Sequence, residues 1–142
     1  MVTDLITRLS KLDAPDREVD ALIVAKLEPH IFDAPGFTPI RPIPSFHIDP
    51  QGDAIRFDGG GIMCLSYFPL YTASVDAVIA LTERVLPGWH WSIYDTDGVG
   101  RCNAQLERPD FTGAEDFDGT GATPAIALLI ALLRAKEAIH GQ

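Results

Sequence analysis

The side chains of this chain that could act as nucleophile or base are two cysteines and four histidines: Cys64, Cys102, His30, His47, His90 and His140. A nucleophile needs a base within hydrogen-bond reach to become reactive. None of these residues lies in a known nucleophile motif, and the sequence Gly-x-Ser-x-Gly is absent. A catalytic site would therefore have to assemble from residues that are distant in the sequence.

One assembly of this kind would lie between a proline-rich segment and a later strand pair. It would use His90 or His47 together with Cys64, Asp58 or Asp97. Cys102 offers a second arrangement, because it shares a sheet face with His90 in one of the two possible strand registers. Buried cysteines mostly act as small core residues, and the core is the favoured interpretation of Cys102.

Aromatic side chains provide the main candidates for ligand binding. Trp89 and Trp91 alternate with His90, and together with His47 and Asp97 they form the candidate ligand-binding set. Two indole rings on one strand face can stack on a ligand ring, but such rings more often lie in the core, which is the favoured interpretation here.

Metal chemistry has weaker signals. The chain has no Cys-x-x-Cys and no His-Glu-x-x-His motif. Two acidic segments, 95–98 and 115–121, have carboxylates at suggestive spacing but lack the later acidic residue of a calcium loop. The glycine triplet 59–61 is followed by neither Lys-Ser/Thr nor a helix, so it indicates a tight turn. We therefore predict no metal and no cofactor, and a solvated acidic face.

The elements that would position these residues can be read from periodicity and capping signals. Apolar spacing and caps predict helices over about 3–12, 15–27, 73–86 and 124–140. Alternation predicts a hairpin over about 89–95 and 101–108, followed by a glycine-rich loop over 110–121. Prolines make 29–69 an irregular excursion, with brief strands at 54–57 and 62–67 and a hairpin at the glycines.

Bulk composition narrows the class of protein. The chain has 142 residues and 46% hydrophobic residues, which predicts a single domain over 1–142. Its net charge of −9 argues against nucleic acid and anionic membranes as partners. Two cysteines cannot form a disulfide framework, and no signal peptide or membrane-spanning run is recognisable. A cytoplasmic protein is the expected class.

Three blocks of sequence, in this order, resemble the phage ABA sandwich domain, a family of small phage and prophage proteins. The blocks are Pro15-Asp-Arg-Glu-Val-Asp-Ala-Leu-Ile, then Tyr71-Thr-Ala-Ser-Val-Asp-Ala-Val-Ile with Leu86-Pro-Gly-Trp-His-Trp, and Ala122-Thr-Pro-Ala-Ile-Ala-Leu-Leu-Ile-Ala-Leu-Leu-Arg-Ala. The resemblance implies an α+β fold, a three-layer α/β/α sandwich with a small, mainly antiparallel sheet, in the cytoplasm of a bacterial host. It implies no reaction and no catalytic residues.

Three functions are compatible with these features. The favoured one is a phage- or prophage-encoded, non-enzymatic binding or interaction module for a host or phage protein or a small ligand, with a homo-oligomer left open. The alternatives are a small hydrolase-like enzyme with a site between the proline-rich segment and the hairpin, and a minor virion or assembly component.

Overall fold

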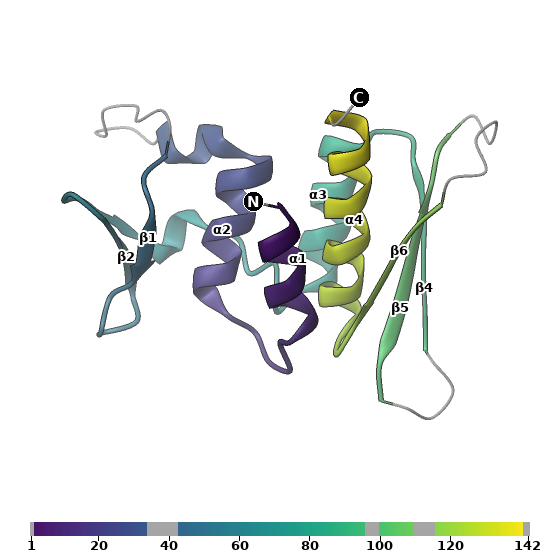
Figure 1. The fold of residues 1–142 in the computed structure, drawn as a ribbon, viewed down its shortest axis with the longest axis horizontal. Helices are drawn as coiled ribbons and strands as arrows, with labels where there is room; N and C mark the ends of the chain where they lie inside the picture. Colours follow the sequence, from purple (N-terminus) through teal and green to yellow (C-terminus); the bar gives the residue numbers. More distant parts are fainter. Residues whose placement is uncertain (1, 34–42, 96–99, 110–115, 141–142) are drawn as a thin grey trace. The chain divides into compact units, whose positions relative to one another are not determined.

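A computed structural model describes residues 2–33, 43–95, 100–109 and 116–140 of the chain (Figure 1). The described residues form helices and two small antiparallel sheets of three strands each, so the chain belongs to the α+β class. They group into two compact units, unit 1 over 1–15 and 71–142 and unit 2 over 16–70. The sequence predicted a single domain over 1–142 without this division into units. The single domain stays a prediction.

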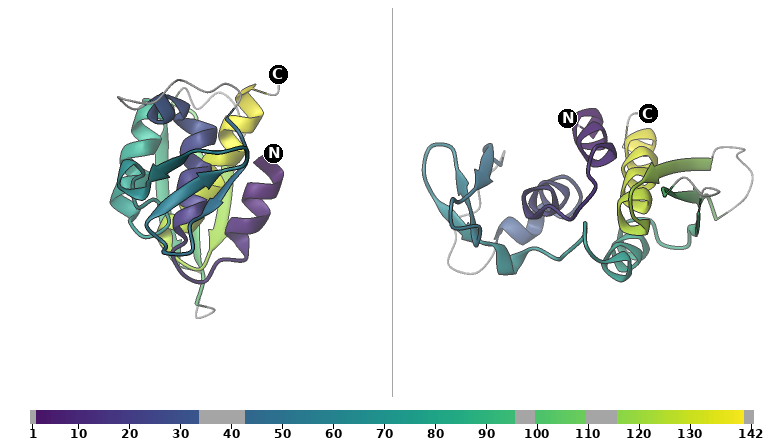
Figure 2. Two further views of the ribbon diagram at one scale, coloured as in Figure 1. Left: turned by 90° about the vertical axis from the view of Figure 1, so that its left-hand side faces the viewer. Right: turned by 90° about the horizontal axis from the view of Figure 1, so that it is seen from below.

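Unit 1 is a layer of helices on a sheet. Its elements are α1 (Val2–Ser10), α3 (Val75–Val85), β4 (His90–Asp95), β5 (Cys102–Glu107), β6 (Asp116–Gly121) and α4 (Pro124–His140), and the sheet has the order β4-β5-β6. Helix α4 packs against the sheet and against α1 and α3. Figure 1 and the right-hand view of Figure 2 show α4 along one face of the sheet, and no described helix covers the other face.

Local signals explain where these helices begin. The Ser74 hydroxyl caps α3 by accepting a hydrogen bond from the amide of Ala77, and the Thr123 hydroxyl accepts one from the amide of Ile126 at the start of α4. The all-apolar run of α4, from Ala125 to Leu133, is buried throughout. The predicted helices and the predicted hairpin all form, with ends within about two residues of the expected ones.

The predicted loop over 110–121 is wrong for its second half, which forms strand β6. Gly119 and Gly121 of β6 both lie against the backbone of α4. A Cβ atom at Gly119 would overlap the carbonyl oxygen of Ala127 and lie 2.7 Å from the amide nitrogen of Ala131. The glycines that suggested a loop are therefore the residues that let a helix and a strand approach closely.

Unit 2 has its own sheet and its own aromatic core. Its elements are α2 (Arg17–Leu27), η1 (Pro29–Asp33), β1 (Phe46–Ile48), β2 (Ala54–Phe57), β3 (Ile62–Cys64) and η2 (Leu65–Tyr67), and the strand order is β1-β2-β3. Four phenylalanine rings meet with centroid distances of 5.3–6.1 Å: Phe32, Phe46, Phe57 and Phe68.

The expected hairpin at the glycines is confirmed, with β2 and β3 as its strands and Gly59, Gly60 and Gly61 all at positive φ in the turn. Strand β1 was not predicted, and the interpretation of 29–69 as an irregular excursion is corrected by the sheet and the aromatic cluster. No described helix is long and apolar enough to cross a membrane.

Candidate functional site

The predicted ligand-binding residues fall in both units. Trp89 directly precedes β4, and His90 and Trp91 begin that strand in unit 1, while His47 lies on β1 in unit 2. Asp97 lies outside the described residues. The enzyme hypothesis draws on residues from both units, and it stays a prediction.

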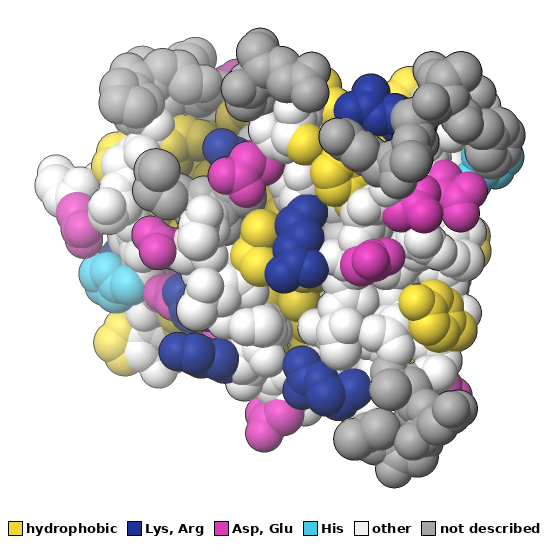
Figure 3. Space-filling model, turned by 45° about the vertical axis from the view of Figure 1, so that its right-hand side comes forward, with side chains coloured by type: hydrophobic (Ala, Val, Ile, Leu, Met, Phe, Trp, Pro, Cys, Tyr) yellow, Lys and Arg dark blue, Asp and Glu magenta, His cyan; other side chains and the backbone are white. Residues whose placement is uncertain are grey.

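The face of the unit 1 sheet that α4 does not cover is polar, and we call it the outer face. The strand registers place its side chains in three rows: His90, Glu107 and Asp116; Ser92, Gln105 and Asp118; Tyr94, Asn103 and Thr120. Every one of these side chains is exposed or partly exposed. Acidic side chains, isolated hydrophobic side chains and some basic ones are visible on the side of the molecule that Figure 3 turns forward.

Hydrogen bonds across the strands order the outer face. The Gln105 side-chain amide donates to the Asp116 carboxylate at 2.7 Å, and the Thr120 hydroxyl donates to the Asn103 amide oxygen at 2.7 Å. Side chains held in this way lose less conformational entropy when a partner binds. The acidic side chains Glu107, Asp116 and Asp118 add negative charge to one part of the face.

The opposite, helix-facing side of β4 is only partly covered. Trp89 packs against Phe117 at 6.0 Å between ring centroids, and the Arg108 guanidinium lies 5.6 Å from the Trp89 ring. Trp91, by contrast, is 40% exposed. The favoured interpretation of both tryptophans as core residues is therefore wrong for Trp91, because β4 is the edge strand and α4 lies mainly over β5 and β6.

The unit 2 sheet does not bring the Cys64 thiol together with the His47 imidazole. The His47 Nδ1 atom lies 3.8 Å from an Asp58 carboxylate oxygen, and both side chains are more than half exposed. Cys64 is on β3, whereas His47 is on β1 with β2 between them. Two strand spacings of about 4.8 Å each therefore separate the thiol from the imidazole, which is too far for proton transfer between them.

The possible pairing of Cys102 with His90 is excluded by the observed register. His90 lies opposite Glu107 and Asp95 lies opposite Cys102, so the two residues are at opposite ends of the strand pair. They also lie on opposite faces of the sheet, because opposite residues share a face and alternate along the strand. The Cys102 thiol is buried on the helix side, and this burial and the nearby Asp95 carboxylate raise its pKa.

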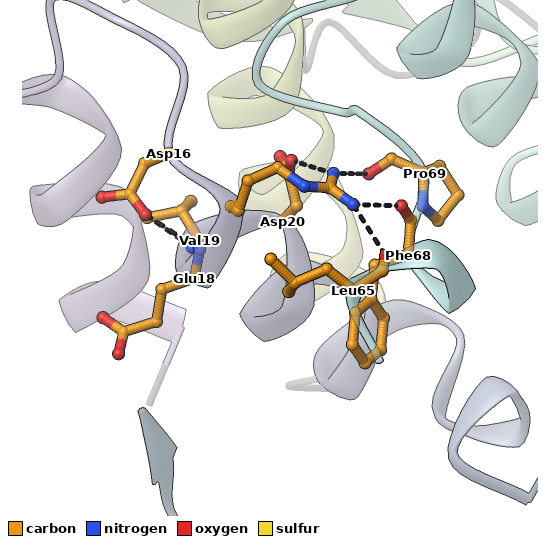
Figure 4. Close-up of polar contacts among 8 residues, drawn as sticks. Asp16, Glu18, Val19, Asp20, Leu65, Phe68 and Pro69 are labelled. Carbon is orange, nitrogen blue, oxygen red and sulfur yellow. Dashed lines mark hydrogen bonds and ion pairs between the residues drawn. The ribbon is translucent and has the colours of Figure 1, made fainter. Parts of the chain in front are cut away.

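A polar cluster that the sequence reasoning missed surrounds Arg17 (Figure 4). The Arg17 guanidinium pairs at 2.6 Å with the carboxylate of Asp20, which is fully buried. The same guanidinium donates to the carbonyl oxygens of Leu65, Phe68 and Pro69 at 2.7–3.1 Å. Arg17 thus connects α2 to the last residues of unit 2, 65–69, through hydrogen bonds.

The acidic neighbours of Arg17 also have structural roles. Asp16 caps α2 by accepting hydrogen bonds from the amides of Glu18 and Val19, and Glu18 accepts one from the amide of Ile48 on β1. The block Asp16-Arg17-Glu18-Val19-Asp20, part of the family resemblance, therefore holds unit 2 together. Among the described residues, no three His, Cys, Asp or Glu side chains form a group able to hold a metal ion.

The two thiols should differ in reactivity. Cys64 is exposed and accepts a 3.2 Å hydrogen bond from the Ser66 hydroxyl, and this bond, with the Ser66 backbone, lowers the thiol pKa. Because the thiolate is the reactive form, we expect a maleimide or disulfide reagent to label Cys64 quickly and Cys102 slowly at neutral pH.

Ser66→Ala removes the main contact that lowers the Cys64 pKa, so labelling at pH below that pKa should become slower. At high pH, where both proteins are fully ionised, the two rates should converge. A rate that is unchanged by Ser66→Ala across the pH range would contradict the role of this hydroxyl.

Comparison of the chain with protein-family models, with curated proteins and with solved structures found no match. The resemblance to the phage ABA sandwich domain therefore depends on the three sequence blocks alone.

Proposed function

We propose that this protein is a non-enzymatic binding module of phage or prophage origin that takes a protein partner on the outer face of its unit 1 sheet. The observation that supports this function is the outer face itself: three rows of exposed or partly exposed polar side chains, ordered by hydrogen bonds across the strands. The other side of this sheet packs against α4. The outer face therefore lies on a supported sheet, which suits recognition of a partner.

The charge of the outer face indicates the chemistry of the partner. Glu107 on β5 lies opposite Asp116 on β6, and Asp118 follows two residues later on the same face of β6. The chain as a whole has a net charge of −9. A partner surface with Lys or Arg side chains would complement this face and would be steered to it electrostatically. The proposal also retains two finer parts of the sequence prediction, namely the cytoplasm of a bacterial host and the exclusion of nucleic acid.

The test is a comparison of matched variants as bait in host lysate. Gln105→Ala with Asp118→Lys changes the centre of the outer face and leaves β4 untouched. Gln51→Ala with Asp58→Lys makes the same chemical changes at exposed residues of unit 2. We expect one protein to be retained by the wild type and by the unit 2 variant, and to be lost by the outer-face variant.

Binding of the captured protein should then be measured with purified components by titration calorimetry. Equal affinity for the wild type and the outer-face variant would contradict the proposal. Hydrolysis of an ester or phosphodiester by the pure protein, abolished by His47→Ala or Cys64→Ala, would instead favour the hydrolase alternative.

A further inference from the structure

Strand β4 is an edge strand with few of the residues that normally prevent edge strands from pairing. Its six residues, His-Trp-Ser-Ile-Tyr-Asp, include no lysine, proline or glycine. Natural sheets usually protect an edge with such residues, with a bulge or with a covering element. The opposite edge, β6, differs: it has two glycines and two aspartates and is in contact with both α4 and α1. The two edge strands of this sheet thus differ in composition and in their contacts with helices.

Apolar surface accompanies the unprotected edge. Trp91 is 40% exposed and Tyr94 is 52% exposed, and Ile93 is only partly buried. Trp91 and Ile93 are on the helix-facing side of the sheet, but α4 lies mainly over β5 and β6 and leaves these two side chains partly exposed. A second strand beside β4 would cover them.

We propose that β4 pairs with β4 of a second copy of the chain, antiparallel and two-fold symmetric about Ser92. In this register Trp91 lies opposite Ile93 of the second copy, so apolar residues meet on the helix side of the sheet, and His90 lies opposite Tyr94 on the outer face. The two sheets become one sheet of six strands with both helix layers on the same side.

Charge complementarity selects this register. Asp95 lies opposite Trp89 of the second copy, and the Arg108 guanidinium lies over that ring, 5.6 Å from its centroid. Each dimer therefore has an Asp95 beside an Arg108 at both ends of the new strand pair. A register shifted by two residues, centred on Ile93, would place Asp95 opposite Trp91 and lose both ion pairs.

The two-fold axis makes Ser92 a sensitive position for a test. Ser92→Lys would place two lysines directly opposite each other, which destabilises a strand pair. By sedimentation velocity of the full chain we expect the wild type to be dimeric and Ser92→Lys to raise the dimer dissociation constant about tenfold or more. Thr120→Lys adds the same charge to the same face of β6 and should leave the dimer intact. Circular dichroism checks that both variants are folded.

Two further experiments identify the interface independently of Ser92→Lys. Asp95→Arg should weaken the dimer, and adding Arg108→Asp should restore it, because the exchange re-forms both ion pairs. With Cys64→Ser as background, Ser92→Cys should form a disulfide-linked dimer on oxidation, since residues at the two-fold axis are within disulfide distance, whereas Thr120→Cys should not.

A monomeric wild type, a dimer that Ser92→Lys leaves unchanged, or equal cross-linking at positions 92 and 120 would each overturn the proposal. The β4 dimer does not depend on what the outer face binds. Loss of dimerisation in Ser92→Lys and loss of partner binding in Gln105→Ala with Asp118→Lys are separate results, so either proposal can fail alone.

Discussion

Gly119→Ala is expected to destabilise unit 1 severely, although it adds a single methyl group. The new Cβ would overlap the Ala127 carbonyl oxygen and crowd the Ala131 amide, and both are backbone atoms of a buried helix. Backbone atoms cannot rotate away as a side chain can, so α4 would have to move off the sheet. We expect a loss of about 3 kcal/mol in the free energy of unfolding, measured by urea denaturation.

Gly100→Ala is the matched control in the same unit. Gly100 has φ of +73°, and a methyl group added there would have no neighbouring atom within 4 Å, so alanine meets only backbone strain. That strain costs about 1–2 kcal/mol. Backbone preference alone would rank the two substitutions in the opposite order, because Gly119 is in a strand that alanine tolerates. A smaller loss at Gly119 than at Gly100 would contradict the close approach of α4 and β6.

The second large effect is expected for Arg17→Met. This substitution removes the cation beside the fully buried Asp20 carboxylate and the donor to three backbone carbonyl groups. Removing one partner of a buried ion pair costs about 3–5 kcal/mol, because the remaining charge stays in a low-dielectric site. Arg17→Lys should rescue only part of this loss, since one ammonium group cannot replace a planar guanidinium with several donors.

Arg56→Met is the control for Arg17→Met. Arg56 also pairs with a buried aspartate, Asp49, at 2.9 Å, but its side chain is 51% exposed. Water can replace an exposed partner, so the expected loss is about 1 kcal/mol or less. Adding Asp20→Leu to Arg17→Met should recover stability, because it removes the buried charge. Equal losses for the two arginine variants would show that the carbonyl contacts of Arg17 contribute little.

The helices were predictable because short-range signals define them. Asp16, Ser74 and Thr123 each cap a helix through contacts with residues two or three positions away. Strand β6 was not predictable in the same way, since its glycines are explained only by a helix that follows in the sequence and packs back onto it. The signal that could have found it is the period of two in Gly119 and Gly121, matched to small residues four apart at Ala127 and Ala131.

The candidate site was predictable only in part. Alternation alone places His90, Ser92 and Tyr94 on one face of β4, but sequence cannot say that this strand lies at an edge and that Trp91 is exposed. The role of Arg17 depends on carbonyl groups about fifty residues away, and backbone acceptors have no sequence signature. The same limit applies to His47 and Cys64, whose separation is set by the strand order.

The division of the chain has a consequence for the order of events during synthesis. Unit 2 is one continuous stretch, so all its residues have been made once Leu70 leaves the ribosome. Helix α1 is made before unit 2, but its packing partner α4 is made more than a hundred residues later. Domains fold as they emerge, and translation adds about 5–20 residues per second. Helix α1 is thus made before unit 2 but packs only after unit 2 and α4 have been made, and until then its apolar side is open to chaperones.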